Sequence, residues 1–135
     1  MKISPNAPCP CHSGKKYKQC CHPYHKGILP ANAVLLMRSR YCAYALEMAE
    51  YIIRTTHPDN PDFTDSVSEW KEGILEFCRS TSFNGLKIVE FIDGESEAYV
   101  SFEASLGAYT MKEKSRFLKD NGRWLYASAD PQSAH

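Results

Sequence analysis

Four of the six cysteines in this 135-residue chain lie within thirteen positions, in the segment CPCHSGKKYKQCCH at residues 9–22. The preceding segment, MKISPNAP, has no apolar run typical of a signal peptide, and no stretch of the chain reaches the roughly 18 apolar residues of a membrane span. We therefore expect a cytoplasmic protein, in which thiols stay reduced and a disulfide framework does not form. The crowded thiols need another explanation, and a bound metal ion supplies one.

The spacing of these cysteines fits a closed zinc site. Cys9 and Cys11 form one close pair, and Cys20 and Cys21 form a second pair eight residues later. Four thiolates arranged tetrahedrally at about 2.3 Å fill the shell of a structural zinc ion and leave no open position for chemistry. Between the pairs, a Ser-Gly turn and about one helical turn return the chain to the ion. We expect zinc as the cofactor.

Two histidines beside the cysteines leave the ligand set open at this stage. His12 and His22 are both adjacent to a cysteine pair, and either imidazole can replace a thiolate on zinc. His22 is better suited to capping the following segment or to contacting the ligands from outside the coordination shell.

The segment resembles the SEC-C motif, a short zinc module at the tail of the preprotein translocase ATPase and in several bacterial proteins. The shared pattern is CPC, then SGKKYKQC, then Cys or His. The resemblance implies a module over residues 1–27 with the four cysteines as ligands. It also implies a partner, because in the translocase ATPase this module contacts a chaperone and the ribosome. His12 departs from the motif, which usually has Gly there, and a positive φ at that position would suit His less well.

Charge is distributed unevenly along the chain. Residues 1–27 carry five lysines and no acidic residue, whereas residues 28–135 carry a net charge of −5. Lys15, Lys16 and Lys18 either offset the negative charge of a tetrathiolate zinc centre or form a docking face for an acidic partner, which is a nucleic acid, the ribosome surface or an acidic protein face. No RNA-binding signature accompanies them, so specific nucleic-acid recognition is not indicated.

Residues 28–135 have the pattern of an α+β domain. Residues 33–58 are helical in period with a break near Glu47, and a further helix follows with apolar residues from Val67 to Phe77. Cys42 and Cys78 lie on or beside the apolar stripes and are expected to be buried. The period then changes to two in four segments, over residues 86–93, 96–107, 109–120 and 123–129. The short Gly-containing turns between them predict an antiparallel sheet with the helices packed on one face.

This part of the chain resembles the YchJ family. The likeness is carried by LMRSRYCAYAL, by the helix ending in THP and by KSRFLKDNGRWLY. It implies that residues 28–135 adopt the cone-shaped, cystatin-like fold shared with nuclear transport factor 2 and ketosteroid isomerase. It implies no particular activity, because the family is largely uncharacterised.

An inward-facing carboxylate marks a candidate pocket in the cone. Alternation along residues 109–117 places Glu113 and Ser115 on the face that looks toward the helices. A buried carboxylate needs a partner, and we expect Arg38 or Arg40 of the first helix to pair with Glu113. Such a pair is either structural or the base of a ligand-binding or catalytic site. The candidate pocket comprises Arg38, Arg40, Tyr41, His57, Glu113 and Ser115.

Two functions from different classes remain. The first is a non-enzymatic adaptor that docks on a protein or ribosomal partner through the zinc module. The second is a small-molecule-binding protein or small enzyme with its site in the cone, which fold analogy alone supports. The chain has no nucleotide-binding glycine loop, no Ser-His-Asp motif and no Cys-x-x-Cys redox pair.

Overall fold

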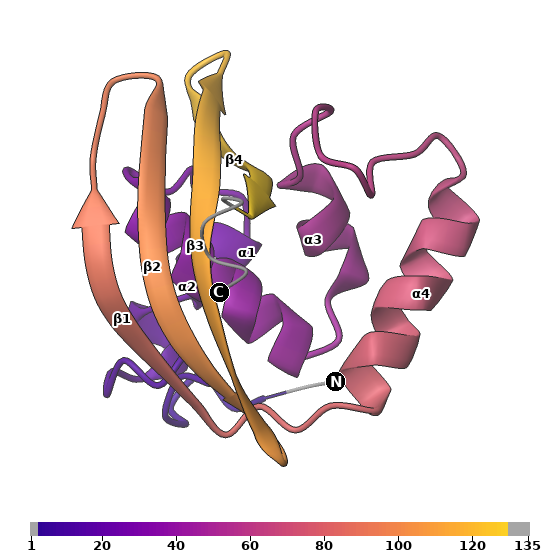
Figure 1. Cartoon of the computed structure of the whole chain (residues 1–135). Coiled ribbons are helices and arrows are strands. Elements are labelled where there is room, and N and C mark those ends of the chain that lie inside the picture. Colours follow the sequence, from indigo (N-terminus) through magenta and orange to yellow (C-terminus); the bar gives the residue numbers. More distant parts are fainter. Residues whose placement is uncertain (1–2, 130–135) are drawn as a thin grey trace.

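The chain forms the predicted order of helices followed by an antiparallel sheet, in a computed structural model that describes residues 3–129 (Figure 1). The helices are the 3₁₀ turn η1 (Tyr17–Gln19), α1 (His22–His25), α2 (Ala33–Ala45), α3 (Ala49–Arg54) and α4 (Val67–Arg79). The strands are β1 (Gly85–Ile92), β2 (Glu97–Leu106), β3 (Tyr109–Asp120) and β4 (Arg123–Ala129). The predicted α+β class is confirmed.

The first long helix begins and breaks where its sequence indicates. The side chain of Asn32 accepts a hydrogen bond of 2.9 Å from the backbone N–H of Leu35, which caps the start of α2. The predicted break is confirmed: α2 ends at Ala45, and Glu47 has a φ of 59° before α3 begins. The predicted end near residue 58 was too late, because the chain after α3 pairs with Tyr126 of β4 instead of continuing the helix.

The four strands are antiparallel neighbours in the order β1-β2-β3-β4. Asn121 and Gly122, with φ of 51° and 80°, form the tight turn that sets Asp120 opposite Arg123. Asn and Gly accept this left-handed backbone at low cost, which is why the pair marks a hairpin in the sequence. Irregular register between Ile88 and Glu90 accompanies the bend of the sheet seen in Figure 1.

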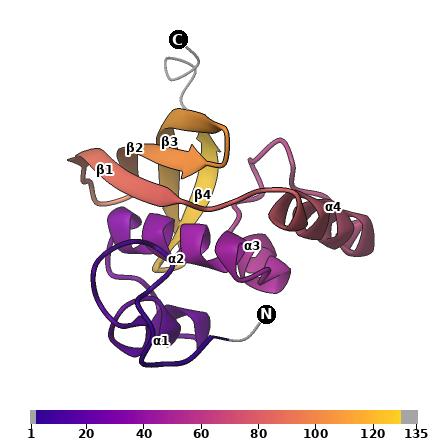
Figure 2. The same cartoon turned by 90° about the horizontal axis from the view of Figure 1, so that it is seen from below.

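Helix α2 lies between two layers. Figure 2 shows the sheet on one side of it and the N-terminal segment with α1 on the other. A single buried cluster accordingly contains Cys9 and Cys11 of the N-terminal segment, Leu36 and Tyr41 of α2, and Val100 of β2. Because both sides of α2 are covered, apolar residues occupy most of its circumference, as expected of a helix inside a core.

Helix α4 occupies a more peripheral position beside α2 and α3, away from the sheet (Figures 1 and 2). It buries Ile74 and Cys78 against a second, smaller apolar cluster. Cys42, which is 0% exposed, and Cys78 are both buried, as predicted. None of the helices in the described part of the chain has the length and apolar character needed to span a membrane.

The division into units over residues 1–27 and 28–135 stays a prediction. Gly27, with a φ of 120°, lies in the connection between α1 and α2, where the predicted boundary falls. The N-terminal segment nevertheless packs directly on α2, so the two predicted units share buried surface.

Candidate metal centre

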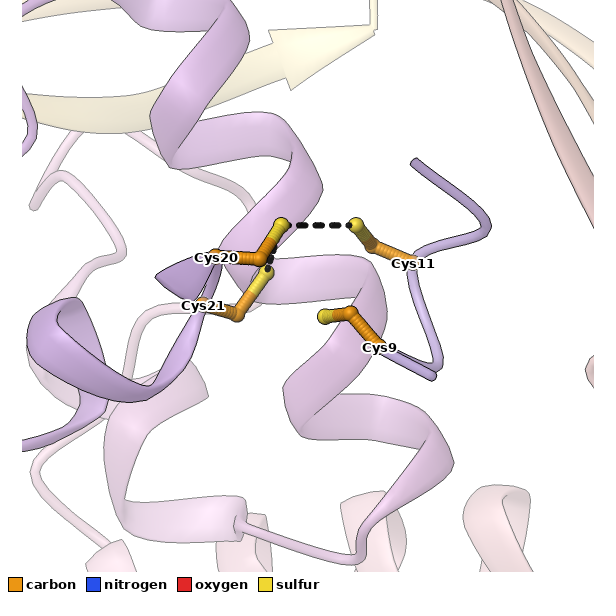
Figure 3. Close-up of side chains that lie close together, drawn as sticks. All are labelled: Cys9, Cys11, Cys20 and Cys21. Carbon is orange, nitrogen blue, oxygen red and sulfur yellow. Dashed lines mark hydrogen bonds between the residues drawn. The ribbon is translucent and has the colours of Figure 1, made fainter. Parts of the chain in front are cut away.

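Figure 3 shows the four clustered cysteines with their side chains converging from two chain segments. Their Sγ atoms all lie within 4.8 Å of one another. The Sγ atoms of Cys11 and Cys20 are 3.5 Å apart, and those of Cys20 and Cys21 are 3.9 Å apart. A tetrahedron with metal–sulfur bonds of about 2.3 Å has edges of about 3.8 Å, so this donor set fits a tetrahedral metal ion.

Backbone hydrogen bonds bring the two pairs together. The N–H of Cys9 donates to the carbonyl of Lys15 at 2.8 Å, and the N–H of His12 donates to the carbonyl of Cys9 at 3.0 Å. Gly14 makes the reversal between them with a φ of 88°, a backbone that favours glycine. The 3₁₀ turn η1 then carries the chain back toward the first pair, as the sequence predicted.

His12 has a positive φ of 62°, the conformation that the usual Gly of the motif would adopt without strain. Its Nε2 lies 3.2 Å from the carbonyl oxygen of Phe83, where an N–H on that nitrogen can donate. The same ring contacts Tyr41 edge-on at 5.8 Å between centroids. The substitution of Gly by His therefore adds a direct connection between the cysteine knuckle and the segment before β1.

His22 lies beside the cluster but is not a member of the four-residue group. Its ring contacts Tyr17 at 5.0 Å between centroids. Its Nδ1 is buried and has no hydrogen-bond partner among residues 3–129. The buried histidine with a complete set of bonds is instead His25, whose two ring nitrogens contact the Tyr17 hydroxyl at 2.7 Å and the Ser39 carbonyl at 2.8 Å.

Arg38 belongs to the cysteine centre and not to the cone, which corrects the expected placement. Its Nη1 donates to the carbonyl of Cys11 at 3.2 Å and lies 3.9 Å from the Sγ of the same residue. Arg38 and Arg40 are two residues apart, or about 200° around a helix, so they face opposite sides of α2. Only one of them could point toward the sheet, and Arg38 points toward the cysteines.

Cys42 is a fifth thiol at the centre that the sequence did not reveal. Its Sγ lies 3.9 Å from the Sγ of Cys9, about as close as the four clustered sulfurs lie to one another. Its helical position predicted burial, but not which layer would cover it. One sequence signal could have located Cys42 at the centre. Helix α2 is apolar on both sides, so a second layer besides the sheet must cover it.

The thiols of the centre differ in how readily they ionise, and contacts with the Cys11, Cys21 and Cys42 thiols lower the pKa of the Cys9 thiol. Burial raises the pKa of the Cys20 thiol to about 11, although the Ser13 hydroxyl, 3.1 Å away, opposes this rise. Contact with Cys11 and burial also raise the pKa of the Cys21 thiol. Four thiolates so close together would repel one another and need a cation to hold them, and Arg38 supplies only one positive charge.

Lys15, Lys16 and Lys18 are exposed on the loop and turn between the cysteine pairs. No acidic side chain pairs with any of them within the described residues. Their charge is therefore open to solvent or to an acidic partner.

A cavity of about 220 Å³ lies on the other side of α2. Four of the six predicted pocket residues line it: Arg40, Tyr41, Glu113 and Ser115. Helix α4 contributes Phe77, and the segment before β1 contributes Phe83. The remaining lining is mainly apolar, with Met37, Tyr44, Phe102, Ala104, Leu106, Met111, Phe117 and Tyr126.

Glu113 faces the cavity as predicted, but it does not pair with an arginine. Its Oε2 accepts hydrogen bonds from the Ser115 hydroxyl and, at 3.1 Å, from the Tyr126 hydroxyl. The Nη1 of Arg40 is instead occupied by the carbonyl of Ile52 at 3.0 Å and by two threonine hydroxyls. The Arg40 guanidinium lies 4.7 Å from the centre of the Tyr126 ring, so that Tyr126 contacts both charged groups.

His57 lies outside the cavity lining, unlike the prediction. Its backbone N–H donates to the carbonyl of Tyr126 at 2.8 Å, and its Nδ1 accepts from the N–H of Asp59 at 3.0 Å. Because this segment pairs with β4, the His57 side chain bonds to its own loop at Asp59 and does not reach the cavity. The cavity is lined instead by Tyr44 and Tyr126, two residues that the sequence interpretation missed. The alternation of strand β4 could have indicated Tyr126, because this residue lies opposite the buried Phe117 of β3.

Comparison with known families explains both parts of the chain. A model of the SEC-C motif matches residues 6–23, and a model of the YchJ middle NTF2-like domain matches residues 32–129. The chain belongs to the YchJ family. The SEC-C motif of this YchJ-family chain and its group of four cysteines indicate a metal-binding site.

Relatives in the YchJ family carry the name UPF0225 protein. One from Serratia proteamaculans is 39% identical over 127 residues, which cover 87% of this chain and 79% of the relative. Another from Deinococcus radiodurans is also 39% identical, over 93% of this chain and 90% of the relative.

Solved structures with the same fold include two SEC-C motif containing proteins. One, from Rhodopseudomonas palustris, is 32% identical with a TM-score of 0.79 and covers 92% of this chain and 98% of its own. The other, from Psychrobacter arcticus, is 29% identical with a TM-score of 0.76 and covers 91% of this chain and 80% of its own. This YchJ-family chain therefore shares its fold, over most of its length, with solved structures of SEC-C motif containing proteins.

Proposed function

We propose that this protein is a non-enzymatic zinc-binding adaptor whose metal module docks on an acidic protein or ribosomal surface. The observation that carries the proposal is the closed four-thiol group with exposed, unpaired lysines beside it among the described residues. Four thiolates fit zinc, and with four protein ligands the ion has no open position for substrate. A centre of this kind stabilises a surface and performs no chemistry itself.

The docking surface consists of Lys15, Lys16 and Lys18. All three are held on the short loop and turn between the ligand pairs, so the metal ion fixes their backbone. With the backbone fixed, only side-chain freedom is lost when an acidic surface binds, and cations without acidic neighbours speed its association.

The docking surface can be tested by changing Lys15, Lys16 and Lys18 together to Gln. We expect zinc content and the thermal unfolding midpoint to stay unchanged, because the three side chains are exposed. Co-sedimentation with ribosomes, or affinity capture of the partner from cell extract, should fall and become less sensitive to salt. Quantitative mass spectrometry of both fractions measures the change.

A matched control changes three exposed sheet lysines, Lys87, Lys112 and Lys119, to Gln. This variant removes the same total charge and should bind like the unaltered chain. If the Lys15/Lys16/Lys18 variant binds as well as the unaltered chain, these lysines are not a docking surface, and their role is to offset the charge of the metal centre. Equal losses in both variants would indicate non-specific attraction by total charge.

The second candidate function, small-molecule binding in the cone, is favoured by one specific observation. The cavity of about 220 Å³ has a carboxylate, Glu113, on an otherwise mainly apolar wall. Ligand sites in proteins commonly combine apolar walls with a few placed polar groups. The two functions are compatible, because the cavity and the metal centre lie on opposite sides of α2.

A further inference from the structure

The carboxylate of Glu113 is only half satisfied within the cavity. The Ser115 and Tyr126 hydroxyls both donate to Oε2, and no residue among 3–129 donates to Oε1. No cationic side chain lies within ion-pair distance of Glu113 in the same part of the chain. An acceptor with negative charge in a mainly apolar space needs a donor, which water or a ligand must supply.

Arg40 lines the cavity but forms no ion pair with Glu113 among the described residues. It is 7% exposed, and its Nη1 already donates to Ile52, Thr55 and Thr56. The Tyr126 ring covers its guanidinium face. A carboxylate or phosphate placed against Glu113 would be repelled by its like charge, which disfavours anionic ligands at this end of the cavity.

An acidic groove adjoins the cavity. Tyr44 and Phe77 line both the cavity and an open groove of about 510 Å³ between the end of α2 and α4. The charged residues that line the groove are Asp62 and Glu69, with no basic residue among the lining. Clefts lined by charge of one sign raise the local concentration of the opposite ion, here a cation.

Aromatic rings complete the environment. Phe77, Phe83, Phe102 and Phe117 line the cavity together with three tyrosines. Ring faces attract a cation that has lost part of its hydration, and their apolar area holds an organic body. A cavity of roughly 150 Å³ holds a benzene ring, so about 220 Å³ accommodates a ring with a short side chain.

From these four features we propose that the cavity binds a small organic cation, a protonated amine on an apolar body about the size of a phenyl ring. The ammonium group donates to Oε1 of Glu113, and the body packs against the Met and Phe side chains of the cavity. The inference deepens the second candidate function and rests on it. It does not depend on the adaptor role.

Three probes with matched bodies test the ligand class on the full, metal-loaded chain: 2-phenylethylamine, 2-phenylethanol and 3-phenylpropionate. Titrations followed by amide chemical shifts in ¹H–¹⁵N NMR spectra report both affinity and location. We expect the amine to give saturable shifts at β2, β3 and α4, with affinity about tenfold higher than that of the alcohol because a charge-assisted hydrogen bond replaces a neutral one. We expect no saturable shifts with the carboxylate.

Glu113→Gln removes the charge and keeps the shape of the side chain. The amine should then bind about as weakly as the alcohol, a loss of about tenfold, while the affinity of the alcohol stays unchanged. Glu103→Gln is the matched control, because Glu103 is on the neighbouring strand β2 and is absent from the cavity lining. This control should leave all three titrations unaltered.

The outcomes separate the ligand class from the function. If the alcohol or the carboxylate binds as tightly as the amine, the cavity binds small molecules but does not select a cation. The same conclusion follows if Glu113→Gln leaves the affinity for the amine unchanged. If Glu103→Gln weakens the amine as much as Glu113→Gln does, the attraction comes from total charge and the site is wrong. If no probe gives saturable shifts at the cavity, the proposal that the cavity binds small molecules is contradicted as well. The comparison of three probes needs no variant and decides the ligand class even if Glu113→Gln fails to fold.

Discussion

Arg38 is the side chain through which α2 donates a hydrogen bond to the cysteine cluster. Its guanidinium donates to the Cys11 carbonyl and approaches the Cys11 sulfur, where its charge would offset part of the negative charge of the proposed tetrathiolate site. Cys42, one helical turn further along, contacts Cys9 from the same helix. Groups outside the coordination shell orient ligands and tune metal affinity, so we expect α2 to contribute to metal retention.

Replacing Arg38 with Met should weaken zinc binding by about tenfold, because the charge and the hydrogen bonds are lost while the apolar length is kept. Competition with a chromogenic chelator of known affinity measures this change. Arg79→Met is a suitable control, since Arg79 is on α4 and pairs with Glu47 at the surface. An affinity equal to that of the unaltered chain would show that Arg38 only fills space beside the module.

At the scale of elements, the turns and periods could be predicted because their causes are local. Asn32 caps α2, and Asn121-Gly122 forms the hairpin before β4, each through its own backbone preference. The alternation that places Glu113 on the inner face is local as well. The four clustered cysteines were candidates from their spacing alone, and the structure brings their sulfurs together.

What could not be predicted depends on contacts between layers. Helix α2 is apolar on two sides, so its sequence does not show which side meets the sheet and which meets the module. For this reason Arg38 was expected in the cone and Cys42 was not expected at the metal centre. The pairing of Thr56 with Tyr126 is also non-local, and it ended α3 early and kept His57 outside the cavity.

At the scale of the whole molecule, the fold has three layers with α2 in the middle. The cavity between α2 and the sheet does not include any of the clustered cysteines in its lining. The sheet, α2 and α3 also bury large apolar residues of their own, among them Phe117 and Ile52. This division of contacts predicts that the two layers on α2 respond differently to loss of metal.

Removing the metal with a chelator should release residues 3–27 from α2 while β1–β4 stay folded. Structural zinc contributes roughly 10–16 kcal/mol to small modules of this kind, which have little core of their own. Hydrogen exchange followed by mass spectrometry should show loss of protection in the N-terminal peptides and retained protection in the strands. Equal loss of protection in the strands would mean that the chain is one cooperative unit with no boundary near residue 27.

The account depends most on the four sulfur ligands, and X-ray absorption at the zinc edge tests them most directly. The protein should be purified under reducing conditions and its zinc content measured on the same sample. We predict one zinc ion per chain with four sulfur neighbours at about 2.3 Å. Absence of zinc, or a shell in which a nitrogen at about 2.0 Å replaces one of the sulfurs, would contradict the assignment of Cys9, Cys11, Cys20 and Cys21 as the complete ligand set.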